Sequence, residues 1–315
     1  MDGLPQSLVL DAPSSGRRVS SQTTLKSAID CVGVGVHSGH RVRLTMHPAP
    51  AGHGIVFHRT DLDRSIPARF DHVLDARLCT VLGDPLDPTV RVGTVEHLMA
   101  ALAGRGVDNA LVELDGPEVP IFDGSAAPIL FLLDCAGVVP LGEARPTIEI
   151  MQPVRVSDGA AFAELRPSPD AQPGLAMAFS IDFAASAIGR QAYSLDLTAD
   201  TFRHELSRAR TFAIASEVAE LRAKGLALGG SLENALVVDG PDVLNPGGLR
   251  MPEEFVRHKL LDAVGDLALA GAPIHGQFVA HRSGHALNNR LLRALFANAG
   301  AWQFRLGASL ADVAA

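Results

Sequence analysis

Hydrophobic and polar positions separate most clearly over residues 251–271, MPEEFVRHKLLDAVGDLALAG. At 100° per residue the apolar side chains sweep out one arc of a helix, while His258, Asp262 and Asp266 fall on the opposite arc, one turn apart. A proline near the start and a glycine at the end are residues typical of helix boundaries. The pattern therefore predicts one long helix with a stripe of titratable side chains.

This stripe has two interpretations. An imidazole and a carboxylate one turn apart can bind the same divalent metal ion, which leaves Asp266 available for a neighbouring group. The alternative is a solvated face, but such a face usually alternates acids with lysine or arginine four residues apart. Here Glu254, His258, Asp262 and Asp266 form one column without a cation. The carboxylates of this column repel one another unless a metal ion or another partner compensates their charge. The helix alone leaves both interpretations open.

The rest of the chain alternates short apolar runs with turns. In the first half the pattern predicts strands at 32–36, 41–46, 54–58, 78–82 and 109–114 and helices at 94–104 and 127–136. In the second half it predicts strands at 148–156, 161–165, 175–183 and 276–282 and helices at 199–207, 215–224 and 289–297. Thr94 is the expected N-cap of its helix, and Gly104 is expected just past the end of that helix.

Both halves end in the order helix, strand, loop, helix, which is a weak internal repeat. Residues 142–146, GEARP, interrupt the pattern between the two halves. We therefore expect an α+β fold of two similar domains, at 23–142 and 147–315, each with a β-sheet layered against α-helices. A flexible tail is expected at 1–22.

Composition narrows the class of protein. The chain has 315 residues, 47% hydrophobic and 20% charged, which suits two folded domains, and its net charge of −8 argues against a nucleic-acid surface. Three scattered cysteines indicate a reducing compartment and argue against a cysteine-based metal site. The N-terminus resembles neither a signal peptide nor a membrane span, so we expect a cytoplasmic protein without stable membrane insertion. Nucleotide-binding glycine motifs and a GxSxG elbow are absent from the sequence.

A catalytic metal site typically has three protein ligands and one open position, and the helix at 251–271 offers two ligands. His97 could be the third, with the adjacent Glu96 as general base, although such a pair can also be ordinary surface. His285 follows a glycine after a predicted strand. If Asp266 holds one of its ring nitrogens, it could act as general acid or oxyanion stabiliser; otherwise it is an exposed loop histidine.

Several long segments together resemble the UDP-3-O-acyl-N-acetylglucosamine deacetylase family, in order from about Thr23 to Trp302. They are TVEHLMAALAGRGVDNALVELDGPEVPIFDGSAAP, SRARTF, GLALGGSLENALVV, LNPGGLRMPEEFVRHKLLDAVGDLALAG and SGHALNN. The resemblance implies zinc-dependent hydrolysis of the N-acetyl group of UDP-3-O-acyl-N-acetylglucosamine, which yields UDP-3-O-acyl-glucosamine and acetate. This is the committed step of lipid A biosynthesis in Gram-negative bacteria. It also implies an active site between two α+β domains.

By motif position, the resemblance makes His97, His258 and Asp262 the ligands of one zinc ion per chain, with Fe²⁺ as an alternative metal. Glu96 would be the general base that activates the attacking water. The partner would be a small-molecule UDP-sugar lipid precursor with a 3-O-acyl chain, and we expect a monomer. Without the resemblance, the residues alone are also compatible with another metal-dependent amidohydrolase, or with a binding protein of this fold that has lost turnover.

The resemblance assigns four further roles. His285 would be the acid that protonates the leaving amine, with Asp266 orienting it, Thr211 would hydrogen-bond the tetrahedral intermediate, and Lys259 would approach the anionic UDP portion. A hydrophobic passage for the acyl chain is expected within about 211–239. Its expected lining residues are Phe212, Val218, Leu232, Ala235 and Val237.

The segment around this passage departs from the family pattern. Ala213, Ile214 and Ala215 stand where many members have a glycine and bulkier side chains, and Glu217 stands where an aspartate is common. These differences leave the chemistry intact but leave the preferred acyl-chain length open.

Overall fold

The computed structural model describes residues 21–169 and 173–306, and it is a mixed α+β protein. The predicted tail at 1–22 lies almost entirely outside the described residues. Its last two residues are strand rather than tail, because β1 (Ser21–Leu25) pairs antiparallel with β10 (Val138–Ala144).

The first half forms a five-stranded sheet of order β2-β3-β9-β4-β5. The strands are β2 (Ile29–Val34), β3 (Arg41–Pro48), β4 (Ile55–Arg59), β5 (Arg64–Pro67) and β9 (Ala110–Leu114). β3 alternates as its sequence predicts, with Val42, Leu44 and Met46 buried, so the sheet has one apolar face. A smaller sheet contains β6 (Val73–Asp75), β7 (Val81–Asp84) and β8 (Asp87–Val92), after the 3-10 turn η1 (Phe70–His72).

The second half forms a seven-stranded sheet. One path has the order β12-β13-β19-β11-β20, and β14 pairs with both β19 and β15. The strands are β11 (Pro146–Ile150), β12 (Val154–Asp158), β13 (Ala161–Arg166), β14 (Leu175–Asp182), β15 (Arg190–Leu197), β19 (Ile274–His281) and β20 (Trp302–Leu306). The predicted strand at 148–156 is thus two strands.

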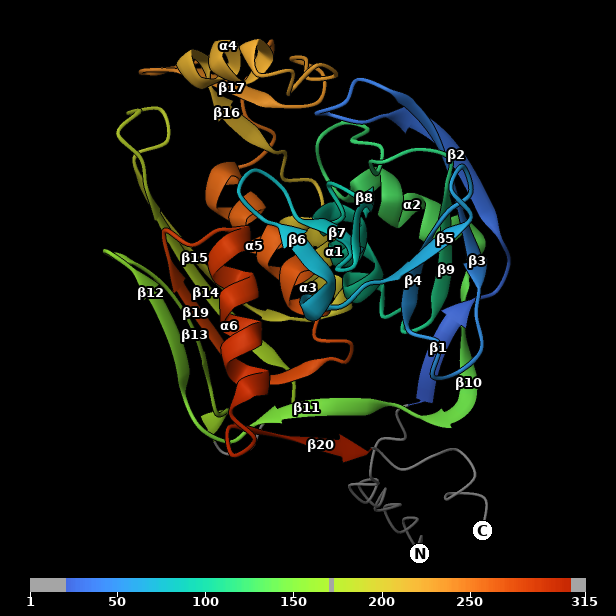
Figure 1. Cartoon of the computed structure of the whole chain (residues 1–315). Helices are drawn as coiled ribbons and strands as arrows, with labels where there is room; N and C mark the ends of the chain where they lie inside the picture. Colours follow the sequence, from blue (N-terminus) through green and yellow to red (C-terminus); the bar gives the residue numbers. More distant parts are fainter. Residues whose placement is uncertain (1–20, 170–172, 307–315) are drawn as a thin grey trace, which may run out of the picture.

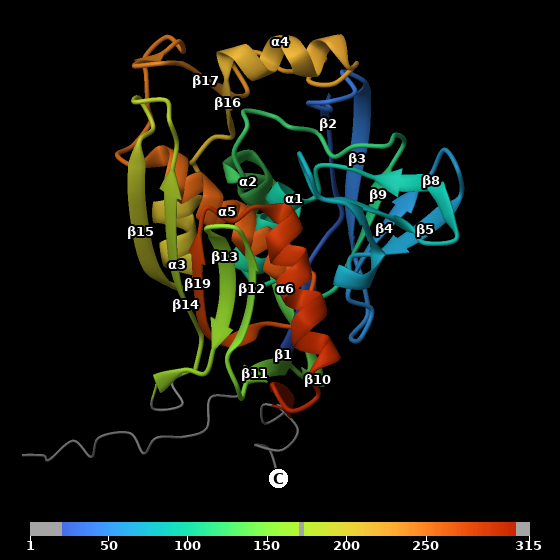
Figure 2. The ribbon, with the colours of Figure 1, turned by 60° about the vertical axis from the view of Figure 1, so that its left-hand side comes forward.

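The helices lie between these two sheets, as Figures 1 and 2 show. They are α1 (Glu96–Arg105), α2 (Ala127–Ala136), α5 (Glu254–Ala268) and α6 (His285–Ala297), together with short α3 (Ala199–Thr201), which continues into the π-helix η3 (Phe202–Leu206). The buried apolar side chains form one cluster with members from both halves. Among the described residues, no helix combines the length and hydropathy that crossing a bilayer requires.

The predicted domain boundary at 142–146 lies within strands. β10 continues to Ala144 and β11 begins at Pro146, so only Arg145 separates them, and its guanidinium pairs with Asp108 at 2.7 Å. GEARP therefore does not interrupt secondary structure, although the chain does pass there from one half to the other. The division into domains at 23–142 and 147–315 stays a prediction.

Helix boundaries differ from the prediction at two positions in α1. Thr94 is not the N-cap: Val95 holds that position, and Thr94 has φ 55° and donates its hydroxyl to Glu118. Gly104 lies inside the helix, where a β-carbon would come within 2.2 Å of the Phe202 ring. Glycine is required there by packing against η3, not by the helix end.

The segment that follows Thr211 forms a small layer at the top of Figure 1. β16 (Phe212–Ile214), β17 (Leu236–Asp239) and β18 (Asp242–Val243) make a three-stranded sheet, with α4 (Ala215–Ala223) packed on β16 and β17. None of the residues of α4 is buried. The loop after α4 contacts the first half, where Gly229 N donates to the carbonyl of Val36 at 3.1 Å.

Candidate active site

Three predicted metal ligands from two helices lie together in the core. His97 is in the first turn of α1, and His258 and Asp262 are one turn apart in α5. One potential ligand atom from each lies within 4.8 Å of the other two, and all three residues are at least 95% buried. Asp262 Oδ1 is 3.5 Å from His97 Nε2 and 3.3 Å from His258 Nε2. The polar stripe of α5 is therefore not a solvated face.

The atoms of this cluster fit a divalent metal ion. Asp262 Oδ1 is buried and has no hydrogen-bond donor among the described residues. His258 Nδ1 lies 3.0 Å from the carbonyl of Ala209, which makes Nδ1 the donor and leaves the Nε2 lone pair facing Asp262. Burial lowers the pKa of His258 to about 4, so the ring is neutral at pH 7. Imidazole nitrogens with a carboxylate oxygen are a donor set that zinc and related metals accept.

The second oxygen of Asp262 is occupied by a lysine. Lys259 Nζ donates to Asp262 Oδ2 at 2.7 Å. Burial alone would raise the pKa of Asp262, but the neighbouring His258 ring and the Lys259 ammonium hold it well below its ordinary value. Lys259 is thus mostly buried and ion-paired, and it also lines a cavity of about 340 Å³ together with Phe183 and Arg282.

Glu96, immediately before His97, points one oxygen toward the cluster. Its side chain is nearly inaccessible, and Oε2 accepts the backbone N–H of Thr80 at 3.0 Å. Oε1 has no such partner within residues 21–169 and 173–306, and it lies 3.8 Å from His285 Nε2. Burial raises the pKa of Glu96, because an apolar environment disfavours the carboxylate. A carboxylate with a raised pKa and one accessible oxygen is suited to accept a proton near neutral pH.

His285 is the first residue of α6 and not a loop residue, as Gly284 before it had suggested. The helix begins four residues earlier than the predicted range 289–297. Its Nδ1 lies 2.9 Å from Asp266 Oδ2. Burial alone would lower the pKa of His285, but the charges of Asp266 and Glu96 raise it to about 9. At pH 7 the ring is therefore an imidazolium whose Nε2–H faces Glu96 and the cluster.

Sequence reasoning missed three groups that hold these side chains. Thr80 Oγ1 donates to Asp266 Oδ1 at 2.6 Å, and Asn288 Nδ2 donates to Asp266 Oδ2 at 2.8 Å. The carbonyl of Ala209 is the third, as the partner of His258. These contacts join segments far apart in the chain, so periodicity carries no signal for them. SRARTF and SGHALNN, which contain Ala209 and Asn288, were singled out only through the family resemblance.

Thr211 directly precedes β16, and Phe212 is the first residue of that strand. Thr211 N donates to the carbonyl of Gly124, and the Thr211 carbonyl accepts Leu236 N, both at 2.8 Å. The Phe212 ring packs edge-on against Phe255 at 5.1 Å between centroids and lies 6.3 Å from the His258 ring.

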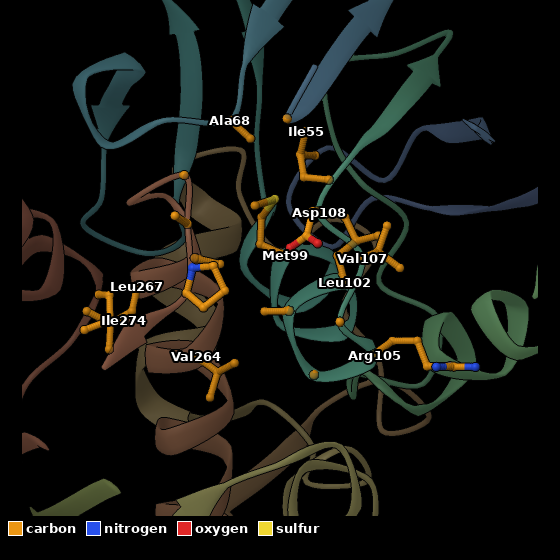
Figure 3. A pocket seen from close by; sticks show the side chains of 18 of the residues that line it. Ile55, Ala68, Met99, Leu102, Arg105, Val107, Asp108, Val264, Leu267 and Ile274 are labelled. Carbon is orange, nitrogen blue, oxygen red and sulfur yellow. The ribbon is translucent and has the colours of Figure 1, made fainter. Parts of the chain in front are cut away.

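The other residues expected along the acyl passage are farther along this segment. Val218 is in α4, Leu232 is 43% exposed, and Ala235 and Val237 are half-buried. Their role as passage lining stays a prediction. A larger cavity, about 560 Å³, lies elsewhere between α1 and α5 and contains none of the cluster; Figure 3 shows its apolar side chains, among them Met99 and Val264.

Two imidazoles and a carboxylate arranged around one point, flanked by a second carboxylate and an imidazolium, are the groups that a metal-dependent hydrolase requires. The family model for UDP-3-O-acyl N-acetylglycosamine deacetylase matches residues 22–297. The chain belongs to this family, as the resemblance predicts.

Relatives from several bacteria carry the name UDP-3-O-acyl-N-acetylglucosamine deacetylase. The protein of Idiomarina loihiensis is 50% identical, over 90% of this chain and 92% of its own length. The protein of Haemophilus influenzae strain 86-028NP is 49% identical over the same shares. That of Shewanella sp. strain W3-18-1 is 48% identical over 93% of this chain and 95% of its own length. The similarity thus spans nearly the whole length of these relatives.

Proposed function

We propose that this protein is a zinc-dependent deacetylase acting in the cytoplasm. It hydrolyses the N-acetyl group of UDP-3-O-acyl-N-acetylglucosamine to UDP-3-O-acyl-glucosamine and acetate, in lipid A biosynthesis. The observation that carries the proposal is the buried Asp262 Oδ1, which faces the Nε2 atoms of His97 and His258 without a donor among the described residues. The names of the relatives supply the substrate.

His97, His258 and Asp262 would hold the metal. When bound there, zinc would polarise the amide carbonyl and lower the pKa of a water molecule in its open position. Lys259 keeps Asp262 ionised, and the Ala209 carbonyl keeps the His258 proton on Nδ1, so the ligand atoms of both stay deprotonated.

Glu96 takes the proton from the attacking water. Its Oε2 is tethered to Thr80, so Oε1 is the oxygen available as base. The raised pKa brings Glu96 closer to neutral pH, where a general base is most effective. The water oxygen then attacks the acetamide carbonyl, and the Thr211 hydroxyl donates to the oxyanion of the tetrahedral intermediate.

His285 supplies the proton that the leaving nitrogen needs. Its Nε2–H is delivered to the amine as the C–N bond breaks, while Asp266 holds Nδ1 and fixes the ring plane. One water is consumed: the glucosamine nitrogen gains the His285 proton, acetate leaves with release of one proton to solvent, and the proton that Glu96 took from water restores the imidazolium of His285. Lys259 lies at the edge of a cavity with Arg282, a position suited to the anionic diphosphate, and Phe212 adjoins the path expected for the acyl chain.

Acetate release from UDP-3-O-acyl-N-acetylglucosamine tests this function. The wild type is expected to release one acetate per amine formed, to lose activity after treatment with a zinc chelator, and to recover it on addition of zinc. A protein that binds the UDP-sugar without releasing acetate would be a binding protein of this fold. Activity that the chelator leaves unchanged would rule out the metal mechanism.

A further inference from the structure

Thr80 contacts two carboxylates of the site at once. It lies directly before β7 and is 2% exposed. Its backbone N–H donates to Glu96 Oε2 at 3.0 Å, and its hydroxyl donates to Asp266 Oδ1 at 2.6 Å. Its carbonyl accepts the N–H of Val95, the N-cap of α1, at 3.3 Å. Every polar atom of this residue is therefore used to hold α1 or α5.

These contacts place Thr80 behind both carboxylates and His285 in front of them. Each carboxylate gives one oxygen to Thr80. The other oxygen of Glu96 lies 3.8 Å from His285 Nε2, and the other oxygen of Asp266 lies 2.9 Å from His285 Nδ1, while Asp266 Oδ1 is 3.2 Å from the same nitrogen. Thr80, Glu96, His285 and Asp266 thus form a ring of contacts that joins α1, α5 and α6, and one short residue contacts both carboxylates.

The hydroxyl of Thr80 is suited to fix the orientation of the Asp266 carboxylate. A β-branched side chain has few χ1 rotamers, so the position of Oγ1 follows from the backbone. A hydroxyl donor to a carboxylate is a strong, charge-assisted hydrogen bond. Asp266 also accepts Asn288, which is itself bonded to Ser283. Loss of the Thr80 hydroxyl therefore leaves Asp266 Oδ1 with only its longer contact to His285 Nδ1, at 3.2 Å, so the carboxylate is held less firmly.

We propose that Thr80 is a positioning residue that sets the acid His285 relative to the base Glu96. The inference rests on the proposed function, since it uses the roles assigned there to Glu96, Asp266 and His285. Glu96 takes one proton from water and His285 gives another to the leaving nitrogen while the same substrate molecule stays bound in one position. Misplacement of either group by a fraction of an ångström lowers the rate without changing how substrate binds.

Thr80→Val tests the proposal because it keeps the shape and the backbone N–H and removes only the hydroxyl. We expect kcat to fall about 10- to 100-fold, the effect of one hydrogen bond to a charged group, with KM within about twofold. Zinc content should stay close to that of the wild type, while the unfolding temperature falls, because a buried carboxylate loses its shortest hydrogen bond. Thr80→Ser, which restores the hydroxyl, should recover most of kcat.

Thr24→Val is the matched control. Thr24, in β1, is also buried. Its hydroxyl donates to the Asn109 carbonyl and accepts the N–H of Ala49, and none of these residues belongs to the cluster of His97, His258 and Asp262. This variant should lower the unfolding temperature and leave kcat unchanged. The proposal is overturned if Thr80→Val leaves kcat unchanged as Thr24→Val does, loses zinc, or changes KM alone, or if Thr80→Ser fails to recover kcat.

Further variants and the activity of the wild type distinguish a failure of this inference from a failure of the proposed function. If Thr80→Val does not fold, Thr80→Ala and Thr80→Ser give the same comparison: Ala must show the loss of kcat and Ser must not. A wild type that releases no acetate would overturn the proposed function and this inference together. An active wild type with a fully active Thr80→Val would overturn this inference alone.

Discussion

Gly265 of α5 lies directly against the backbone of Glu96 in α1. A β-carbon at position 265 would come within 2.0 Å of the Glu96 carbonyl oxygen. The close approach brings the start of α1, with Glu96 and His97, against the middle of α5 with its own ligands. The crossing of these two helices is what assembles the site.

Gly265→Ala should therefore destabilise the protein and disrupt the site. The methyl group meets backbone rather than a flexible side chain, so the helices must separate, at a cost of about 3 kcal/mol in the free energy of unfolding. Denaturant unfolding measures this cost. Gly142→Ala, where a β-carbon would meet nothing within 4 Å, is the control and should unfold like the wild type. Equal stability of the two variants would contradict the packing argument.

Zinc content tests the ligand assignment. The wild type should hold about one zinc per chain, and His258→Ala should hold almost none, because two remaining ligands bind the metal weakly. His281→Ala is the matched control, since His281 Nδ1 lies 2.9 Å from Ser180 Oγ in β14, and His281 belongs to no group of possible metal ligands in the part of the chain that the structure describes. Metal analysis after gel filtration distinguishes them. Unchanged zinc in His258→Ala would refute the assignment.

The pH dependence of kcat follows from Glu96 and His285. Glu96 must be deprotonated and its pKa is raised, so the rate should rise with pH on the acidic side. His285 must be protonated, and its pKa is raised to about 9, so the rate should fall as the pH passes about 9. Asp266→Asn removes a charge that raises this pKa, so the alkaline limb should move to lower pH. An alkaline limb that stays in place would contradict the role of His285.

Part of this arrangement could be predicted from the sequence. The 3.6-residue period placed His258, Asp262 and Asp266 on one face, because these residues belong to one helix and their spacing is local. The period also implied a polar face opposite an apolar one, whereas α5 is buried almost all round, Glu254 included. Whether a polar stripe is solvated depends on the elements that pack against it. Here the stripe of α5 is covered by α1, which belongs to the other half of the chain.

The remaining contacts have no local signature. His97 is a candidate third ligand because it adjoins Glu96, but no spacing links residues more than 150 positions apart, and the family resemblance was needed to select it. Thr80 lies 186 positions from Asp266, and its hydroxyl becomes a donor to that carboxylate only when α1 and α5 cross. At Thr94, capping preference was overridden by a left-handed backbone and a hydrogen bond to Glu118.

A buried ion pair at the start of α5 should support the ligands. Glu254 is fully buried and accepts hydrogen bonds from Arg210 Nε and from the backbone N–H of Arg250. The bond to Arg210 fixes the residue next to Ala209, whose carbonyl accepts the hydrogen bond of His258. Glu254→Gln leaves a buried arginine uncompensated and should cost about 3–5 kcal/mol of unfolding free energy.

The exposed pair of Asp30 and Arg43 is the control for this substitution. Asp30→Asn should cost less than about 1 kcal/mol, because solvent screens an exposed pair. Both variants can be compared by urea unfolding. Similar small losses in the two would show that the buried pair does not organise this segment.

Acetate release by Glu96→Ala, with its zinc content measured on the same sample, tests the central claim most directly. We expect the variant to keep about one zinc per chain, because Glu96 is not a ligand, and its kcat to fall about 10²- to 10⁴-fold through loss of the general base; these two results together would establish the mechanism. A variant that holds zinc and releases acetate at the wild-type rate would contradict it.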